Sequence, residues 1–124
     1  MLQKQTQLII KDNSGVKKAQ CIQVYNKKIG TVGDLILVSV KQIQKKRDNS
    51  KISLEKGSLY KALIIGQKNF KSNLLGTYTL FNENSAILLD NQNQPIGTRI
   101  LGPIPLSLRF VKKFKLIAIG SVFI

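Results

Sequence analysis

Residues 30–40 read GTVGDLILVSV, a cluster of turn-forming residues followed by a run of leucine and β-branched side chains. Leu35–Val40 has the length of a strand and is shorter than an ordinary helix. Its glycines could also form a loop that holds phosphate groups, but the stretch lacks the Lys-Ser/Thr ending of a Walker motif and does not match the dinucleotide-binding fingerprint. We therefore predict a tight turn that leads into a strand.

The same combination of a turn and a short apolar run recurs along the chain. Residues that bend the backbone also gather at 12–15, 48–50 and 90–94. The apolar runs are Leu8–Ile10, Ala19–Tyr25, Leu35–Val40, Leu59–Ile65, Thr77–Phe81, Ala86–Leu89 and Leu116–Ile119. Runs of this length and spacing predict an all-β barrel or sandwich, as a single domain over residues 1–124.

Three segments differ from this pattern. Residues 42–51 are polar and basic around a central turn, which predicts a hairpin tip or an extended loop that reaches out of the barrel. Leu106–Lys113 is the only stretch that resembles a helix, and it follows two prolines. The apolar stretch Leu116–Ile124 is far shorter than the ~20 residues that span a bilayer, so we predict a closing strand and no membrane insertion.

The charge of the chain indicates a polyanionic partner. Twenty lysines and arginines face six acidic residues, which gives a net charge of +14. So large an excess in 124 residues would repel itself unless a polyanion neutralised it. A basic protein can also bind a membrane surface, but that requires an amphipathic helix, and the apolar residues here form strand-like runs. Nucleic acid is therefore the expected partner.

The side chains that usually carry catalysis are scarce. Histidine is absent, Cys21 is the single cysteine, and the six carboxylates are dispersed. We therefore expect no catalytic residue, no metal site and no cofactor. Cys21 alternates with Ala19, and we expect both to face the core, because a free cysteine behaves as a small buried hydrophobe.

Basic residues recur in clusters, mostly at predicted strand ends and in loops. These clusters are Lys17-Lys18, Lys27-Lys28, Lys45-Lys46-Arg47, Lys68 with Lys71, and Lys112-Lys113 with Lys115. Paired lysines can simply solvate a surface, but several clusters on one small barrel can reach several separated phosphate backbones, as a protein embedded in folded RNA must. The aromatic residues are spread singly, which argues against a base-stacking platform for single strands.

The most distinctive stretch is QPIGTRILGPI at residues 94–104. Here the sequence resembles the universal family of the large-subunit ribosomal protein numbered fourteen. The likeness extends over nearly the whole chain, in matching blocks that follow one another in the family's order. The blocks are Met1, Gln3, Gln5 and Thr6; Asp12-Asn13-Ser14-Gly15; Cys21-Ile22 with Val24; Val32-Gly33-Asp34; Lys56-Gly57; Lys61-Ala62; Asn84; Leu88-Leu89; residues 94–104; and Leu108-Arg109.

This resemblance implies a five-stranded β-barrel with a projecting β-ribbon and a short helical C-terminal region, bound to large-subunit rRNA. It also implies a place at the face that meets the small subunit, bridges to small-subunit rRNA, and neighbours from the large-subunit families numbered three and nineteen. The candidate RNA-binding residues are Asn13, Ser14, Lys17, Lys18, Lys45, Lys46, Arg47, Lys61, Lys68, Arg99, Arg109, Lys112 and Lys113.

Within this set, Arg99 is the residue that we expect to matter most at the intersubunit face. Pro95 and Gly97 would set the backbone so that the following arginine points in a fixed direction. The alternative is that Arg99 pairs with a nearby carboxylate such as Asp90 and only braces the barrel. Asn13, Ser14 and backbone groups of their loop are expected to fix the register on RNA.

The chain departs from the family pattern at three places. Gly66-Gln67-Lys68 stands where the family usually has Arg-Thr-Lys, and Leu106-Ser107 stands where it has Arg-Glu. In the family these two places are expected to contact RNA, and the resemblance does not carry those two contacts over to this chain. The ending Gly120–Ile124 replaces an Ala-Pro-Glu-Val-Leu type, which would alter a site read by a ribosome-silencing factor.

Composition bears on where such a ribosomal protein would work. Three of the twenty cations are arginines, Trp is absent, and Lys, Ile, Asn and Leu are plentiful, as AT-rich coding produces. The start of the chain lacks the pattern of a secretory signal or an import leader, so we expect a protein made where it works or shown without its leader. A mitochondrial ribosome is the first expectation, and a bacterial cytoplasm or plastid stroma is the alternative. Among functions, a free barrel-type translation factor or RNA chaperone is the second reading, and an enzyme is a distant third.

Overall fold

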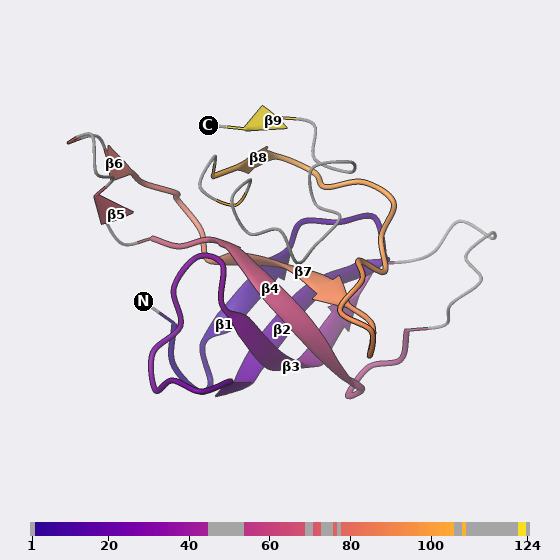
Figure 1. Ribbon diagram of the computed structural model, residues 1–124. Helices are drawn as coiled ribbons and strands as arrows, with labels where there is room; N and C mark the ends of the chain where they lie inside the picture. The colour runs from indigo at the N-terminus through magenta and orange to yellow at the C-terminus, as the bar shows by residue number, and fades with distance from the viewer. Residues whose placement is uncertain are drawn as a thin grey trace.

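The computed structural model describes residues 2–44, 54–68, 71–72, 76, 78–105, 108 and 122–123. Five of its strands form a closed barrel in the order β1-β2-β3-β4-β7 (Figure 1). The barrel strands are β1 (Gln7–Ile10), β2 (Val16–Val24), β3 (Leu35–Ile43), β4 (Leu59–Gly66) and β7 (Ser85–Leu89). Neighbouring strands are antiparallel except β1 and β7, whose parallel pairing closes the barrel. The all-β prediction and the five-stranded barrel implied by the resemblance are confirmed.

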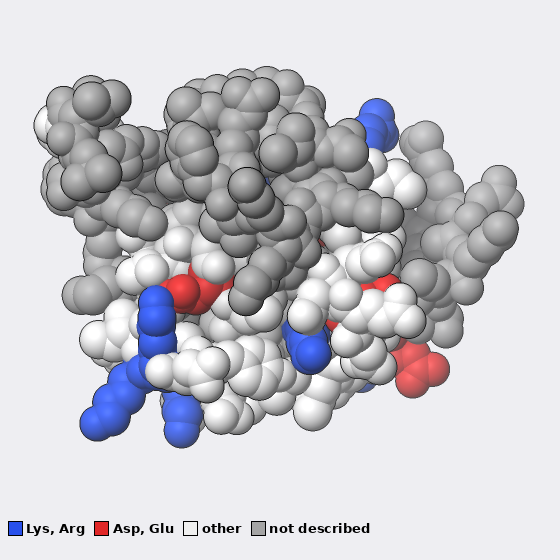
Figure 2. All heavy atoms as spheres, viewed as in Figure 1, with Lys and Arg blue, Asp and Glu red and all other residues white. Residues whose placement is uncertain are grey.

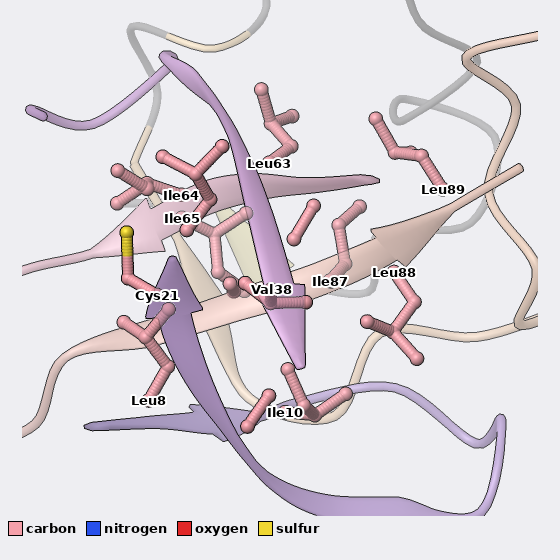
Figure 3. Close-up of a cluster of buried hydrophobic side chains, with 14 of the residues drawn as sticks. Leu8, Ile10, Cys21, Val38, Leu63, Ile64, Ile65, Ile87, Leu88 and Leu89 are labelled. Carbon is pink, nitrogen blue, oxygen red and sulfur yellow. The ribbon is translucent and has the colours of Figure 1, made fainter. Parts of the chain in front are cut away.

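The barrel interior is filled by aliphatic side chains from all five strands (Figure 3). Residues directly opposite one another on paired strands share a face, and the pairs Cys21–Val38 and Ile36–Ala62 are fully or almost fully buried. Cys21 is 1% exposed and Ala19 is 0% exposed, so both predictions for these side chains are confirmed.

Strands β4 and β7 are buried on both faces. Ala62 to Gly66 and all five residues of β7 are buried, although successive side chains on a strand point to opposite faces. Leu63 and Ile87 lie opposite one another on the face away from Ala62, and β8 (Pro103–Ile104), whose Ile104 is fully buried, runs above β4 and β7 in Figure 1. The barrel therefore has a second apolar layer outside this wall.

Two small ladders lie outside the barrel. β5 (Lys71–Ser72) and β6 (Tyr78–Thr79) form an antiparallel ribbon that stands away from it in Figure 1, as the resemblance implied. The strand predicted over Thr77–Phe81 is thus only two residues long and belongs to this ribbon.

The prediction that the C-terminal run closes the barrel is wrong. β9 (Val122–Phe123) pairs in parallel with β8 instead, because β1 and β7 already pair with each other and the barrel has no free edge for another strand. The predicted loop over 42–51 is described only to residue 44, and the predicted helix Leu106–Lys113 only at Leu108, so both lie largely outside the described residues. Within the part that the structure describes, no helix has the length and apolar character needed to cross a membrane.

Candidate nucleic-acid interface

The loop between β1 and β2 is organised by the carboxylate of Asp12. Its Oδ1 accepts hydrogen bonds from the backbone N–H and the hydroxyl of Ser14, at 3.0 and 2.5 Å, and its Oδ2 accepts one from the N–H of Leu88, at 3.1 Å. Asp12 is 5% exposed. Burial raises the pKa of this carboxyl above its ordinary value of 3.8, against the opposing effect of the three hydrogen bonds. Asp12 therefore ties the loop to β7.

Asn13 joins this loop to the stretch that the sequence marks as most distinctive. Its Oδ1 accepts from the backbone N–H of Thr98 at 2.7 Å and of Arg99 at 3.2 Å, and its Nδ2 donates to Thr98 Oγ1 at 2.6 Å. The N–H of Leu101 also donates to the carbonyl of Lys11, at 2.7 Å. We call residues 11–15 and 95–101, joined in this way, the Asn13 clamp.

Gly97 packs closely against residues 12 and 13 of the Asn13 clamp. A Cβ built on it would lie 2.8 Å from Asn13 Oδ1 and 3.0 Å from Asp12 Cβ. Real Cβ atoms do not approach other atoms so closely, so a side chain here would push the two segments apart. Glycine is required for contact between the backbone of 95–99 and the loop.

Arg99 is presented to solvent by the Asn13 clamp. Its side chain is exposed, and it makes no hydrogen bond or ion pair with any residue that the structure describes. The alternative partner, Asp90, uses its Oδ1 to accept from the N–H groups of Gln92 and Gln94, both at 2.9 Å. Asp90 thus caps its own turn and does not brace Arg99.

Lys17 and Lys18 both face solvent at the start of β2. Consecutive residues on a regular strand would point to opposite faces, but the register between β2 and β3 shifts on both sides of Lys18. This bulge turns the second lysine outward, as bulges commonly re-aim a side chain. Only the buried Val16 separates the two lysines from Ser14 and Gly15, so they continue the surface that begins at the Asn13 clamp.

The other candidate residues are more dispersed. Ser14 is buried with its hydroxyl on Asp12, while Lys61 is half-buried in the middle of β4. Lys68 is exposed just after β4, and its N–H donates to Asn84 Oδ1 at 3.0 Å. Residues Lys45, Lys46, Arg47, Arg109, Lys112 and Lys113 lie outside the described residues.

The turn predicted at residues 31–34 is confirmed. Asp34 donates its N–H to the carbonyl of Thr31 at 3.0 Å, and its Oδ2 accepts from the N–H and hydroxyl of Thr31 at 2.8 and 3.0 Å. Burial would raise the pKa of Asp34, but hydrogen bonds from Thr31 and Lys27 outweigh it, so the pKa lies below its ordinary 3.8. Gly33 has a φ of +93°, which only glycine adopts easily.

A model of the family described as ribosomal protein L14p/L23e matches residues 1–124. The chain belongs to this family. It is therefore a structural protein of the large ribosomal subunit, located in a ribosome, and rRNA and other ribosomal proteins are its kinds of partner. Proteins of this kind are typically structural rather than enzymatic.

Because rRNA is a kind of partner for a protein of the L14p/L23e family, the lysines and arginines that no acidic side chain neutralises are the ones available to phosphate groups. Figure 2 shows lysine and arginine side chains gathered at the lower left, over the N-terminal turn and the β2–β3 loop. Sequence reasoning noted Lys27-Lys28 there as one basic cluster but left Lys4 aside. The signal that could have linked them is Leu2, an apolar residue just before the polar stretch Gln3–Thr6, which is fully buried and anchors the turn.

Proposed function

We propose that this ribosomal protein binds large-subunit rRNA by neutralising phosphates, and that residues 95–109 form part of the face that meets the small subunit, where they contact small-subunit rRNA in bridges. The observation that carries the proposal is the Asn13 clamp. It fixes Thr98 and Arg99 through two hydrogen bonds to their backbone N–H groups and one to the Thr98 hydroxyl. It leaves the arginine side chain exposed, with no carboxylate partner among the described residues.

The chemistry of arginine supports this role for Arg99. A guanidinium offers a planar set of donors that can hold two phosphate oxygens at once, which the single ammonium group of lysine cannot reproduce. A rigid backbone beneath it lowers the entropy lost on binding. Asn13 and Ser14 support recognition differently, because their side chains are already bonded within the protein and they shape the loop that leads into β2, where Lys17 and Lys18 lie.

The test replaces Arg99 with lysine, which keeps the charge and removes the planar geometry. We expect the melting temperature of the isolated Arg99→Lys protein to stay at the wild-type value and the share of joined ribosomes to fall. A lowered melting temperature with normal joining would count against the RNA role, because it would show that Arg99 acts within the protein.

The charge excess supports a strongly salt-dependent affinity for rRNA. Neutralising about six phosphates would give a slope of log affinity against log salt of about −4 to −5. A slope near zero would contradict the electrostatic basis of the proposal. Sedimentation after a moderate salt wash separates a resident ribosomal protein, which stays with large subunits, from a translation factor or RNA chaperone, which is released.

The place of the protein in the cell and in the subunit forms a further part of the proposal. The low share of arginine and the divergent ending Gly120–Ile124 support a mitochondrial ribosome. The resemblance to the family supports neighbours of the L-three and L-nineteen families. Sequencing the organelle genome tests the first point. A map of the assembled ribosome tests the second, because it shows which proteins adjoin the barrel.

A further inference from the structure

A basic groove lies where the N-terminal turn meets the β2–β3 loop, before the start of β1 and at the end of β2, whereas the Asn13 clamp lies at the other ends of these two strands. It has a volume of about 580 Å³ and is lined by Gln3, Lys4, Lys27, Lys28 and Ile29, together with the end of β2. We call it the N-terminal groove. None of these residues belongs to the candidate set drawn from the sequence.

The two walls of the N-terminal groove are joined by the backbone. Leu2 donates to the carbonyl of Gly30 at 2.9 Å, and Gly30 donates back to Leu2 at 2.6 Å. The Leu2 side chain is fully buried. A Cβ on Gly30 would lie 2.8 Å from Ile64 Cδ1, so only glycine allows this approach without a shift in the core. The groove is therefore built by the fold and not by a chance contact of side chains.

The N-terminal wall holds Lys4 at the tip of a tight turn. Thr6 closes the turn, since its N–H donates to the carbonyl of Gln3 at 3.3 Å and its Oγ1 accepts from the N–H of Gln3 at 3.1 Å. Gln5 adopts a φ of +69° and donates to the carbonyl of Cys21 at 2.7 Å. Lys4 is thus exposed on a backbone that is fixed on both sides.

The opposite wall carries two lysines that differ in their ion pairing. Lys27 Nζ lies 3.0 and 3.3 Å from the carboxylate oxygens of Asp34, which holds it in place and offsets its charge. Lys28 is exposed and, like Lys4, has no ion-pair partner among the described residues. Two uncompensated cations therefore face the groove from its two walls.

The lining indicates the class of ligand. Lysine is depleted in the cores of protein–protein interfaces, whereas lysines together with neutral amide donors are typical of contacts to a sugar–phosphate backbone. Among the residues that the structure describes, no aromatic side chain lines the groove, so it is not built to stack bases. Ile29, which is 37% exposed, offers a small apolar surface for a ribose.

We propose that the N-terminal groove binds the sugar–phosphate backbone of an rRNA strand, with Lys4 and Lys28 each neutralising a phosphate and Asp34 holding Lys27 in place beside Lys28. This assignment rests on the proposed rRNA binding and adds a contact at a second end of the barrel. An acidic protein surface is the competing occupant.

The experiment compares two variants of equal charge. Lys4→Gln/Lys28→Gln removes the two free cations of the groove, and the control Lys41→Gln/Lys56→Gln removes two exposed lysines outside it. Binding of the full chain to its own large-subunit rRNA is measured across a salt series, with melting temperatures to confirm that both variants fold. We expect the groove variant to have a slope less steep by about 1.4 to 1.8, with the control at the wild-type slope.

Each other outcome overturns the assignment. Equal slopes for the groove variant and the wild type would mean that the groove does not contact phosphate. Equal loss in both variants would mean that only net charge matters. Wild-type RNA binding with poor entry of the groove variant into subunits would indicate a protein occupant. If the wild type itself shows no salt-dependent binding, the proposed function fails, which is a distinct result.

Discussion

Replacing Asn13 with alanine should destabilise the isolated protein, because it removes all three hydrogen bonds of the Asn13 clamp. Each such bond contributes about 0.5–1.5 kcal/mol net. Water can replace part of the loss at this exposed site, so we expect a total of about 1–3 kcal/mol. For a chain of 124 residues, this corresponds to a fall in melting temperature of roughly 3 °C or more.

A matched variant separates the effect of these hydrogen bonds on stability from the effect of Arg99 on rRNA binding. Asn13→Asp keeps an Oδ1 acceptor for the N–H groups of Thr98 and Arg99, and the Thr98 hydroxyl can rotate to donate to the second oxygen. Its melting temperature should therefore stay near the wild-type value, while the new negative charge beside Arg99 weakens rRNA binding.

Thermal melting of the two isolated variants, followed by circular dichroism, checks this reasoning. The alanine variant should melt clearly below the aspartate variant. An alanine variant that melts with the wild type would show that the clamp contributes nothing to stability, and a clamp of that kind could not hold Arg99 in a set direction.

Three further variants test other parts of the structure. Gly30→Ala should cost about 1–3 kcal/mol in denaturant unfolding, because its Cβ would crowd the fully buried Ile64; an unchanged midpoint would contradict this. Asp34 stabilises the fold above pH 3.8 and loses this contribution as the pH falls through its lowered pKa, so Asp34→Asn should be less acid-sensitive than the wild type in unfolding between about pH 2 and 5. Changing all of 45–47 to alanine should reduce incorporation into subunits without altering the circular dichroism spectrum, and an unfolded spectrum would refute a projecting loop.

The barrel strands could be predicted because their signals are local. Leu35–Val40 lies between a turn and a polar stretch, and its length alone favours a strand. The pairing of the strands is not local, which is why the closing strand was placed wrongly. An apolar run such as Leu116–Ile124 favours burial, but the run by itself does not specify which strand edge it pairs with. β1 pairs with its neighbour in sequence, β2, and also with the distant β7, and that second pairing depends on the whole barrel.

The sequence could identify residues of the candidate site, but it could not show how they are arranged in space. Asn13 and Arg99 were selected separately, and the hydrogen bond between them spans 86 positions of the chain. Likewise, a regular strand would have hidden one residue of the Lys17-Lys18 pair. The bulge that exposes both is a register shift against β3, which the sequence of β2 alone does not specify.

The pairing state of each cation connects the fold to its proposed role. Among the described residues, Lys11 pairs with Glu83 at 3.3 Å and Lys27 pairs with Asp34 at 3.0 Å, so the charge of both is already offset within the protein. Arg99 and Lys4 have no such partner, yet each sits on a backbone fixed by hydrogen bonds from a distant segment. An unpaired cation on a fixed backbone loses little entropy when it meets a phosphate, and it weakens no internal ion pair. RNA should therefore be held first by these positioned, unpaired side chains, and only second by the lysines that the protein already neutralises.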